Sequence, residues 1–247
     1  MSTNLAGTAN DNTDSFTYNP AGQIASRTRS NAGYSFASHI NVDTLFNHNG
    51  LNQITSVTGS AAPTYDARGN MTSDGAVSFG YDQYNRLTSA GSATFDYDPL
   101  GRLYQSTGAS GTARRQYDGA DMIAVYNSAG SLTERYVHGP GMDEPLVMYT
   151  GSGTSNRTFF HADARGSIIA HTNSSGYRTA VLAYDEYGNP ASTNPGRYQY
   201  TGQTWLSDAG LYHYKNRAYN PRLMRFMQAD PIGHSGGINL YAYVGGG

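Results

Sequence analysis

The sequence contains no cysteine, so disulfide bonds and thiolate chemistry are both excluded. Lysine occurs once, at Lys215, and glutamate occurs three times. Because exposed helices normally depend on these two residue types, long surface helices are not expected. The 16 Lys and Arg residues nearly balance the 18 Asp and Glu residues, and a net charge of −2 gives no electrostatic reason to expect binding to nucleic acid or to an anionic membrane.

Long apolar runs are also missing. No stretch approaches the ~20 apolar residues of a membrane-spanning helix, and residues 1–15 lack the basic and then apolar pattern of a signal peptide. The seven histidines are scattered along the sequence. The pair His161 and Asp163 comes closest to the spacing of metal ligands. We therefore expect no membrane span, no cofactor and no metal site.

Tyrosine and glycine are present in high numbers. The 247 residues include 21 Tyr and 30 Gly, and the length is sufficient for one or two domains with a buried core. Aromatic residues combined with many turn formers favour β structure. We therefore predict an all-β protein.

A nine-residue frame recurs through the first half of the chain. Its usual pattern is an aromatic residue, any residue, Tyr, Asp or Asn, two variable residues, Gly or Asn, a polar residue and an aliphatic residue. Copies begin at residues 16, 46, 63, 79 and 95, which gives spacings of 30, 17, 16 and 16 residues. A degenerate sixth copy covers residues 115–123, and a seventh begins at Ala183.

The frame has the composition of a strand followed by a turn. Residues two apart point to the same face of a strand, so the aromatic residue and the Tyr share a face. Asp or Asn can bond the backbone two residues further on, and Gly or Asn three positions later suits the positive φ that ends such a turn. Each frame therefore predicts half a β-hairpin. A series of such hairpins leaves an edge strand at each end, which another part of a larger assembly can cover.

These frames resemble the YD repeats of the bacterial Rhs family, which also occur in the C components of insecticidal toxin complexes and in teneurins. Three later stretches strengthen the likeness: residues 117–145, which contain HGPGMDEP, residues 160–190, and residues 200–244, which are similar to the Rhs-associated core motif. The likeness covers nearly the whole chain from Phe16, and the core motif is its most specific part.

The resemblance implies consecutive antiparallel β-hairpins that form a curved or spiralling sheet, part of a hollow shell around a C-terminal toxin domain. It divides the chain into a flexible N-terminus (1–15), a repeat strip (16–199) and a shortened core motif (200–247). It implies a bacterial protein, made in the cytoplasm and exported by a specialised secretion system. Its partners would be the toxin domain, the remaining shell segments, or a second copy paired through the sheet edges.

In this family the core region can act as an aspartic autoprotease that releases the toxin, which requires two carboxylates close enough to share a proton. Asp230, in the stretch DPIG, matches the family's first Asp-Pro-x-Gly, whereas the second would follow residue 247. An aspartate common in the family's YYDP stretch is replaced here by Asn220. We therefore expect a structural chain that is not catalytic on its own, in which Asp230 is either one half of an incomplete dyad or a turn residue.

Four more residues belong to this question. Asp208, in the turn SDAG, is the other carboxylate nearest in sequence, and we expect it to be structural. Arg217, Arg222 and Arg225 match arginines of the core motif. They could pair with Asp230 and hold it ionised, or they could be solvated at the surface.

Two further interpretations stay open. Trp205 and exposed tyrosines would suit a glycan-binding module, whereas stacking of the tyrosines between layers is the structural alternative. The chain could also be an assembly module that joins another shell by strand addition. Any helix is expected as a short piece between Asn220 and Phe226. The ending Tyr243–Gly247 departs from the family, in which the chain continues to the toxin, and indicates a toxin-less remnant or a shortened chain.

Overall fold

The computed structural model of the chain describes residues 1–40 and 42–244, so residues 245–247 of the expected core motif lie outside the described residues. Its regular elements are β-strands joined by turns. In the described ranges, the helical pieces are short 3₁₀ turns: η1 (Thr8–Asn10), η2 (Ala32–Tyr34), η3 (Tyr200–Gly202) and η4 (Gly233–Gly236). The predicted all-β class and the succession of antiparallel hairpins are confirmed. None of the helical turns within this part of the chain has the length and apolar character needed to cross a membrane.

The chain divides into two compact units, each built from several segments. Unit 1 consists of Met1–His39, Tyr117–Ala124 and Leu132–Gln203, and unit 2 consists of Ile40–Gln116, Val125–Ser131 and Thr204–Gly247. Strand β13 (Asp121–Tyr126) contributes residues to both units. The sequence predicted boundaries after residues 15 and 199, between the N-terminus, the repeat strip and the core motif. These boundaries follow the repeats rather than the two compact units, and this division of the chain remains a proposal. The first of these segments, residues 1–15, contains β1 and the beginning of β2.

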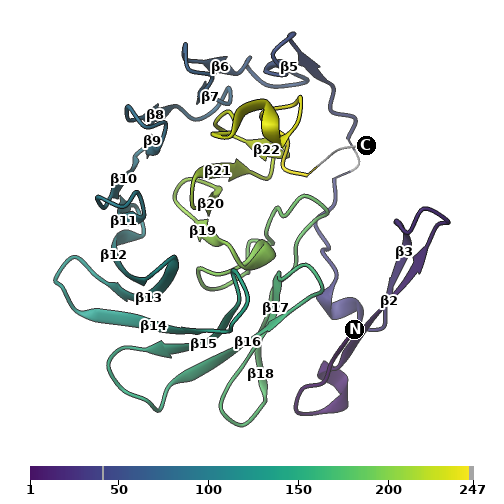
Figure 1. Cartoon of the computed structure of the whole chain (residues 1–247). Helices are drawn as coiled ribbons and strands as arrows, with labels where there is room; N and C mark the ends of the chain where they lie inside the picture. The colour runs from purple at the N-terminus through teal and green to yellow at the C-terminus, as the bar shows by residue number, and fades with distance from the viewer. Residues whose placement is uncertain (41, 245–247) are drawn as a thin grey trace. The chain divides into compact units, whose positions relative to one another are not determined.

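Unit 1 contains two runs of strands. In the first run, the order is β1-β2-β3, and in the second each strand from β14 to β18 pairs with the next (Figure 1). Their bounds are β1 (Ser2–Thr3), β2 (Asn12–Tyr18), β3 (Ile24–Arg29), β14 (Leu132–His138), β15 (Pro145–Thr150), β16 (Arg157–Ala162), β17 (Ile168–Thr172) and β18 (Arg178–Val181). Strand β17 is buried along its whole length, whereas β3 is an edge strand and almost entirely exposed.

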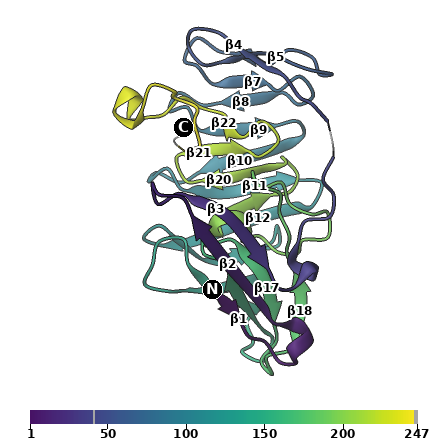
Figure 2. The ribbon, with the colours of Figure 1, turned by 90° about the vertical axis from the view of Figure 1, so that its right-hand side faces the viewer.

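Unit 2 contains the central frames and the core motif. Strands β8 to β12 pair in chain order, and β19 to β22 form a separate four-stranded sheet (Figure 2). The bounds of its strands are β4 (Phe46–His48), β5 (Ile54–Val57), β6 (Thr64–Tyr65), β7 (Met71–Ser73), β8 (Phe79–Tyr81), β9 (Leu87–Ala90), β10 (Ala93–Tyr97), β11 (Leu103–Gly108), β12 (Gly111–Asp118, whose last two residues belong to unit 1), β19 (Thr204–Leu206), β20 (Leu211–Tyr214), β21 (Arg217–Asn220) and β22 (Arg225–Phe226).

Six of the seven frames form the same turn, whereas the degenerate sixth frame has only two residues between β12 and β13. At Asp98 the side-chain Oδ1 accepts the backbone N–H groups of Leu100 and Arg102 at 2.9 Å each, and the Arg102 guanidinium pairs with Oδ2 at 2.7 Å. Gly101, the third residue after Asp98, has φ of 82°, as the frame predicts. The same pair of backbone hydrogen bonds forms at Asn19, Asn49, Asp66, Asp82, Asn127, Asp163, Asn173 and Asp185.

The frame tyrosine links one hairpin to the one before it. The Tyr81 hydroxyl donates to the carbonyl of Met71 at 2.8 Å, and the Tyr97 hydroxyl donates to the carbonyl of Leu87 at 2.9 Å. In both cases the acceptor is the last residue of the preceding frame. A phenylalanine could fill the same space but could not make this bond.

The frames of unit 2 and strands β19–β22 share one hydrophobic core. Its buried members are Ile54, Met71, Phe79, Leu87, Ala90, Ala93, Phe95, Leu103, Leu206, Leu211, Ala218, Leu223 and Met227. The frame tyrosines Tyr65, Tyr81 and Tyr97 pack partly buried against it, so the rings of these frames face one side. Burial of each large apolar side chain stabilises the fold by ~2 kcal/mol. The first frame, in unit 1, differs because Tyr18 is 61% exposed.

The segment expected to hold any helix forms a turn between two strands instead. The Asn220 side-chain Oδ1 accepts the backbone N–H groups of Arg222 and Leu223, which starts a turn directly after β21. Met224 has φ of 57°, which an α-helix does not allow. The chain then enters β22 at Arg225, so residues 220–226 hold no helix and this expectation was wrong.

Candidate functional site

Asp230 follows the four-stranded sheet of unit 2 and is held by Arg217. The two side chains form an ion pair at 3.0 Å, and their exposed fractions are 18% and 16%. The Asp230 Oδ1 accepts the N–H of Ile232, and the Asp230 carbonyl accepts the N–H of Gly233, so DPIG is a turn. Burial lowers the pKa of Arg217, while the carboxylate of Asp230 opposes this shift. Asp230 is therefore both a turn residue and the partner of one cation.

Arg217 also connects this turn to the sheet and to the end of the chain. Its guanidinium carbon lies 3.7 Å from the centre of the Phe226 ring, a cation–π distance. It donates to the carbonyl of Leu240 at 3.4 Å, and the backbone N–H of Asp230 donates to the same carbonyl at 2.9 Å.

Arg222 and Arg225 contact other residues. Arg222 pairs with the buried carboxylate of Asp74, which also accepts the side-chain amide of Asn220 at 3.4 Å. Asn220, the position where the family commonly has aspartate, thus lies beside a carboxylate that the sequence did not single out. Arg225 donates to the carbonyl of Asn52 and to the ring of His48, each at 2.7 Å. Burial and the charge of Arg225 lower the pKa of His48, consistent with a neutral ring that accepts this bond.

Asp208 and Trp205 have local packing roles. The Asp208 carboxylate accepts the backbone N–H of Ser110 at 3.1 Å and its hydroxyl at 2.6 Å, so it caps the turn between β11 and β12. Trp205 is half-buried, and its ring centroid lies 4.6 Å from that of the fully buried Tyr212 on the neighbouring strand. The structure thus places Trp205 against a stacked tyrosine.

A cleft of about 500 Å³ lies beside the Asp230 turn in unit 2. It is lined by the β4–β5 turn at residues 50–53, the β6–β7 turn at residues 65–69, and parts of the chain between Ala229 and Tyr241. Tyr241 is the buried link between these segments, since its hydroxyl donates to the carbonyl of Gly69 at 2.8 Å. The sequence analysis missed Tyr241 and Tyr243, although two tyrosines separated by one residue are a strand signal.

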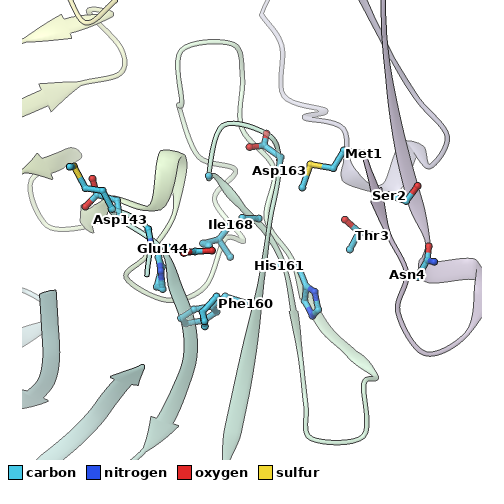
Figure 3. A pocket seen from close by; sticks show the side chains of 16 residues that line it. Met1, Ser2, Thr3, Asn4, Asp143, Glu144, Phe160, His161, Asp163 and Ile168 are labelled. Carbon is cyan, nitrogen blue, oxygen red and sulfur yellow. Dashed lines mark hydrogen bonds between the residues drawn. The ribbon is translucent and has the colours of Figure 1, made fainter. Parts of the chain in front are cut away.

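Unit 1 has a cleft of about 680 Å³, which contains His161 and Asp163 (Figure 3). The His161 ring contacts the Thr172 hydroxyl at 2.9 Å, whereas the Asp163 carboxylate lies 3.6 Å from Arg165 and 3.8 Å from Arg27. Figure 3 shows the two side chains apart from each other. In the described ranges, no group of three or more His, Cys, Asp or Glu residues could hold a metal ion.

No protein-family model matches the chain. Among known proteins, the tRNA3(Ser)-specific nuclease WapA of Bacillus spizizenii is 32% identical over 212 residues, which are 78% of this chain and 9% of that protein. The toxin protein Tse5 of Pseudomonas aeruginosa is 29% identical over 109 residues, which are 42% of this chain and 8% of that protein. The chain therefore spans less than a tenth of the length of these bacterial relatives.

Solved structures show the same fold. The crystal structures of TcdB2-TccC3-Cdc42 and of TcdB2-TccC3 each match with a TM-score of 0.64, over 95% of this chain and 13% of the other, at 18% and 20% identity. At this identity the likeness concerns the fold alone. The sequence relatives and the structural neighbours are Rhs-type proteins, the kind that the sequence motifs resemble.

Proposed function

We propose that the chain is the C-terminal part of an Rhs-type β-shell that encloses or docks with a toxin domain, and that it is structural rather than catalytic on its own. The observation that carries this is the series of matching turns in unit 2, in which the aromatic residues and the last aliphatic residue of each frame lie in or against one core. Such a series extends a sheet and needs no ligand. The nuclease and toxin relatives support a toxin partner, and the protein would be bacterial, made in the cytoplasm and exported with its toxin.

A separable toxin domain tests this function. An inactive nuclease domain of a WapA relative is joined after residue 247 through a linker that a specific protease cuts. We expect the domain to co-elute with the chain after the cut, because docking or enclosure does not depend on the linker. The matched control joins the same domain before Met1. Separate elution of the domain in both arrangements would rule out docking and enclosure.

The non-catalytic part of the proposal rests on the surroundings of Asp230. Its carboxylate bonds to Arg217 and to the backbone N–H of Ile232, whereas an aspartic dyad requires a second carboxylate at this place. We expect the intact mass of the chain to stay constant over days at mildly acidic pH. A smaller product that Asp230→Asn abolishes would instead establish self-cleavage.

Strand addition at β3 is a second candidate function. Strand β3 pairs with β2 on one side, and its side chains are exposed except at Arg29. The N–H of Ser30 donates to Thr13, and alternation along the regular part of the strand then directs the N–H of Arg27 away from β2. If copies associate through this edge, Arg27→Pro should abolish the association measured by light scattering, whereas Arg27→Thr, which loses the same ion pair with Asp14, should preserve it. A wild-type chain that stays monomeric at high concentration would exclude this route.

A further inference from the structure

The end of the described chain lies beside β22 and is joined to it by a single antiparallel bridge. The N–H of Phe226 donates to the carbonyl of Tyr241 at 3.0 Å, and Arg225 and Ala242 form an antiparallel bridge. Residues Leu240–Tyr243, which we call the terminal segment, therefore occupy the free edge of β22 in the four-stranded sheet of unit 2. Addition of a strand to a sheet edge is a common way in which proteins bind peptides.

The first tyrosine of the terminal segment has a polar seat. Tyr241 is 2% exposed, and its hydroxyl donates to the Gly69 carbonyl at 2.8 Å while it accepts the Gln53 side-chain amide at 3.1 Å. Its ring meets that of Tyr65 edge to face at 5.8 Å. Both the ring and the hydroxyl are thus recognised.

The second tyrosine has an aromatic seat. The Tyr243 ring centroid lies 4.4 Å from that of Tyr219 and 5.8 Å from that of Phe226. Its hydroxyl bonds to the hydroxyl of Tyr214 at 2.8 Å. Aromatic side chains in such seats typically supply most of the binding energy of an interface.

The loop before the terminal segment has a different character. Residues 231–238 are exposed except for Gly233, and Figure 2 shows them projecting beyond β21 and β22. Two of the loop's backbone hydrogen bonds, from Gly233 to Asp230 and from Gly237 to His234, are local. The terminal segment is therefore anchored by its own contacts rather than by this loop.

We infer that the terminal segment is a peptide ligand carried by the chain, held by the β22 edge and the two tyrosine seats. It stays bound when the loop at residues 231–238 is cut, so the chain retains anything attached to this segment without a covalent link. The same surface accepts a Leu-Tyr-Ala-Tyr peptide from solution or from a second copy. This inference rests on contacts within unit 2 and does not depend on the shell function.

The test uses the full chain with the site of a specific protease inserted between Ser235 and Gly236. After cutting, gel filtration and native mass spectrometry should find the terminal segment with the main body in equal amounts. An isotope-labelled peptide that matches residues 237–244 should then replace it over time. Complete loss of the segment in the first gel filtration would overturn the inference.

Two variants separate recognition from mere proximity. Tyr243→Ala in the cut protein should release the segment about tenfold faster or more, because an aromatic anchor is lost. Tyr241→Phe keeps the ring and removes only the hydroxyl bonds, so it should release the segment faster without unfolding the chain. The control is Tyr84→Ala, an exposed tyrosine in another turn. If a labelled peptide with alanine in place of both tyrosines exchanged as well as the natural peptide, specific recognition of Tyr241 and Tyr243 would be disproved.

Discussion

The hydroxyl of Tyr97 donates to the backbone carbonyl of Leu87 at 2.9 Å, and this bond joins two successive frames of the repeat. The equivalent bond joins Tyr81 to Met71. The tyrosine therefore contributes both to the core and to the register between hairpins.

Tyr97→Phe should lower the free energy of unfolding by about 1 kcal/mol, because the ring stays in place and one hydrogen bond to a largely buried carbonyl is lost. Urea denaturation measures the change. Tyr104→Phe, at a tyrosine that is 45% exposed on the next strand, is the matched control and should change little. Equal effects of the two substitutions would show that the hydroxyl bond does not join the frames.

Asp98 should tolerate asparagine better than alanine. Although burial alone would raise the pKa of Asp98, the hydrogen bonds from Arg102 outweigh it and hold that pKa below its usual value. Asp98→Ala removes two backbone hydrogen bonds and should lower the free energy of unfolding by about 1 kcal/mol or more. Asp98→Asn keeps them, as Asn49 does in its own frame, and should lose less.

The depressed pKa also fixes a pH dependence for Asp98. The contribution of the carboxylate is present above the unfolded-state pKa and is lost as pH falls through the lower folded value. The difference between wild type and Asp98→Ala should therefore shrink in acid. Thr94→Ala, at an exposed position without an ionisable side chain on the preceding strand, should show no such trend.

Asn220→Asp should place a second carboxylate beside the buried Asp74. The Oδ1 of the new aspartate at position 220 would still accept the N–H groups of Arg222 and Leu223. The turn is therefore kept, and the added charge is the main change. Repulsion raises the pKa of the pair, and we expect a loss of about 2 kcal/mol at neutral pH. Because a raised folded-state pKa favours the protonated fold, the loss should be smallest in acid and grow as pH rises.

Denaturation of Asn220→Asp at pH 4 and pH 7 measures this effect. Asn47→Asp, at an exposed asparagine of β4, is the control. A variant as stable as wild type at both pH values would show that Arg222 alone can neutralise two carboxylates.

His171 should make unit 1 sensitive to acid. Burial, with a smaller effect from His161, lowers the pKa of His171 to about 4 from an ordinary value of 6.5. The neutral ring therefore stabilises the fold above pH 6.5, and this contribution is lost as pH falls toward 4. By linkage the loss is about 3 kcal/mol.

A variant with an unprotonatable side chain isolates this effect. His171→Gln should be less stable at neutral pH but should lose less stability between pH 6.5 and pH 4. His234→Gln, at an exposed histidine, should follow wild type. Parallel stability curves for wild type and His171→Gln would assign the acid sensitivity to other groups, among them His161.

Local pattern predicted most of the fold. The spacing of Tyr, Asp and Gly in the frame at Phe95 gives a strand, a side-chain-capped turn and a positive φ at Gly101, all of which depend on near neighbours. Turns of the same kind at Asn127, Asp163 and Asn173 were not counted as frames. Asp163 and Asn173 lack the tyrosine directly before them, and the turn at Asn127 lacks the first aromatic residue of the frame. An Asp or Asn followed three positions later by Gly would have found them.

The site was less predictable because its partners are remote in sequence. Asp230 and Arg217 lie in one motif, and their pairing was among the alternatives considered. Asp74 lies 146 residues from Asn220, and Gly69 lies 172 residues from Tyr241. Only the packing of the core motif against the early frames brings these groups together, and a single sequence holds no signal for it.

The self-contained turn has a consequence for how such chains change length. Each turn makes its hydrogen bonds within five residues, and Tyr81 and Tyr97 each reach back only ten residues to the frame before. Duplication or loss of a whole 16-residue block would leave the bonds within and between the remaining frames in phase, whereas an odd insertion would invert the faces of all later strands. The repeat itself can therefore grow or shrink by whole blocks, whereas the bonds from the core motif to the early frames, such as those of Asn220 and Tyr241, would need new partners.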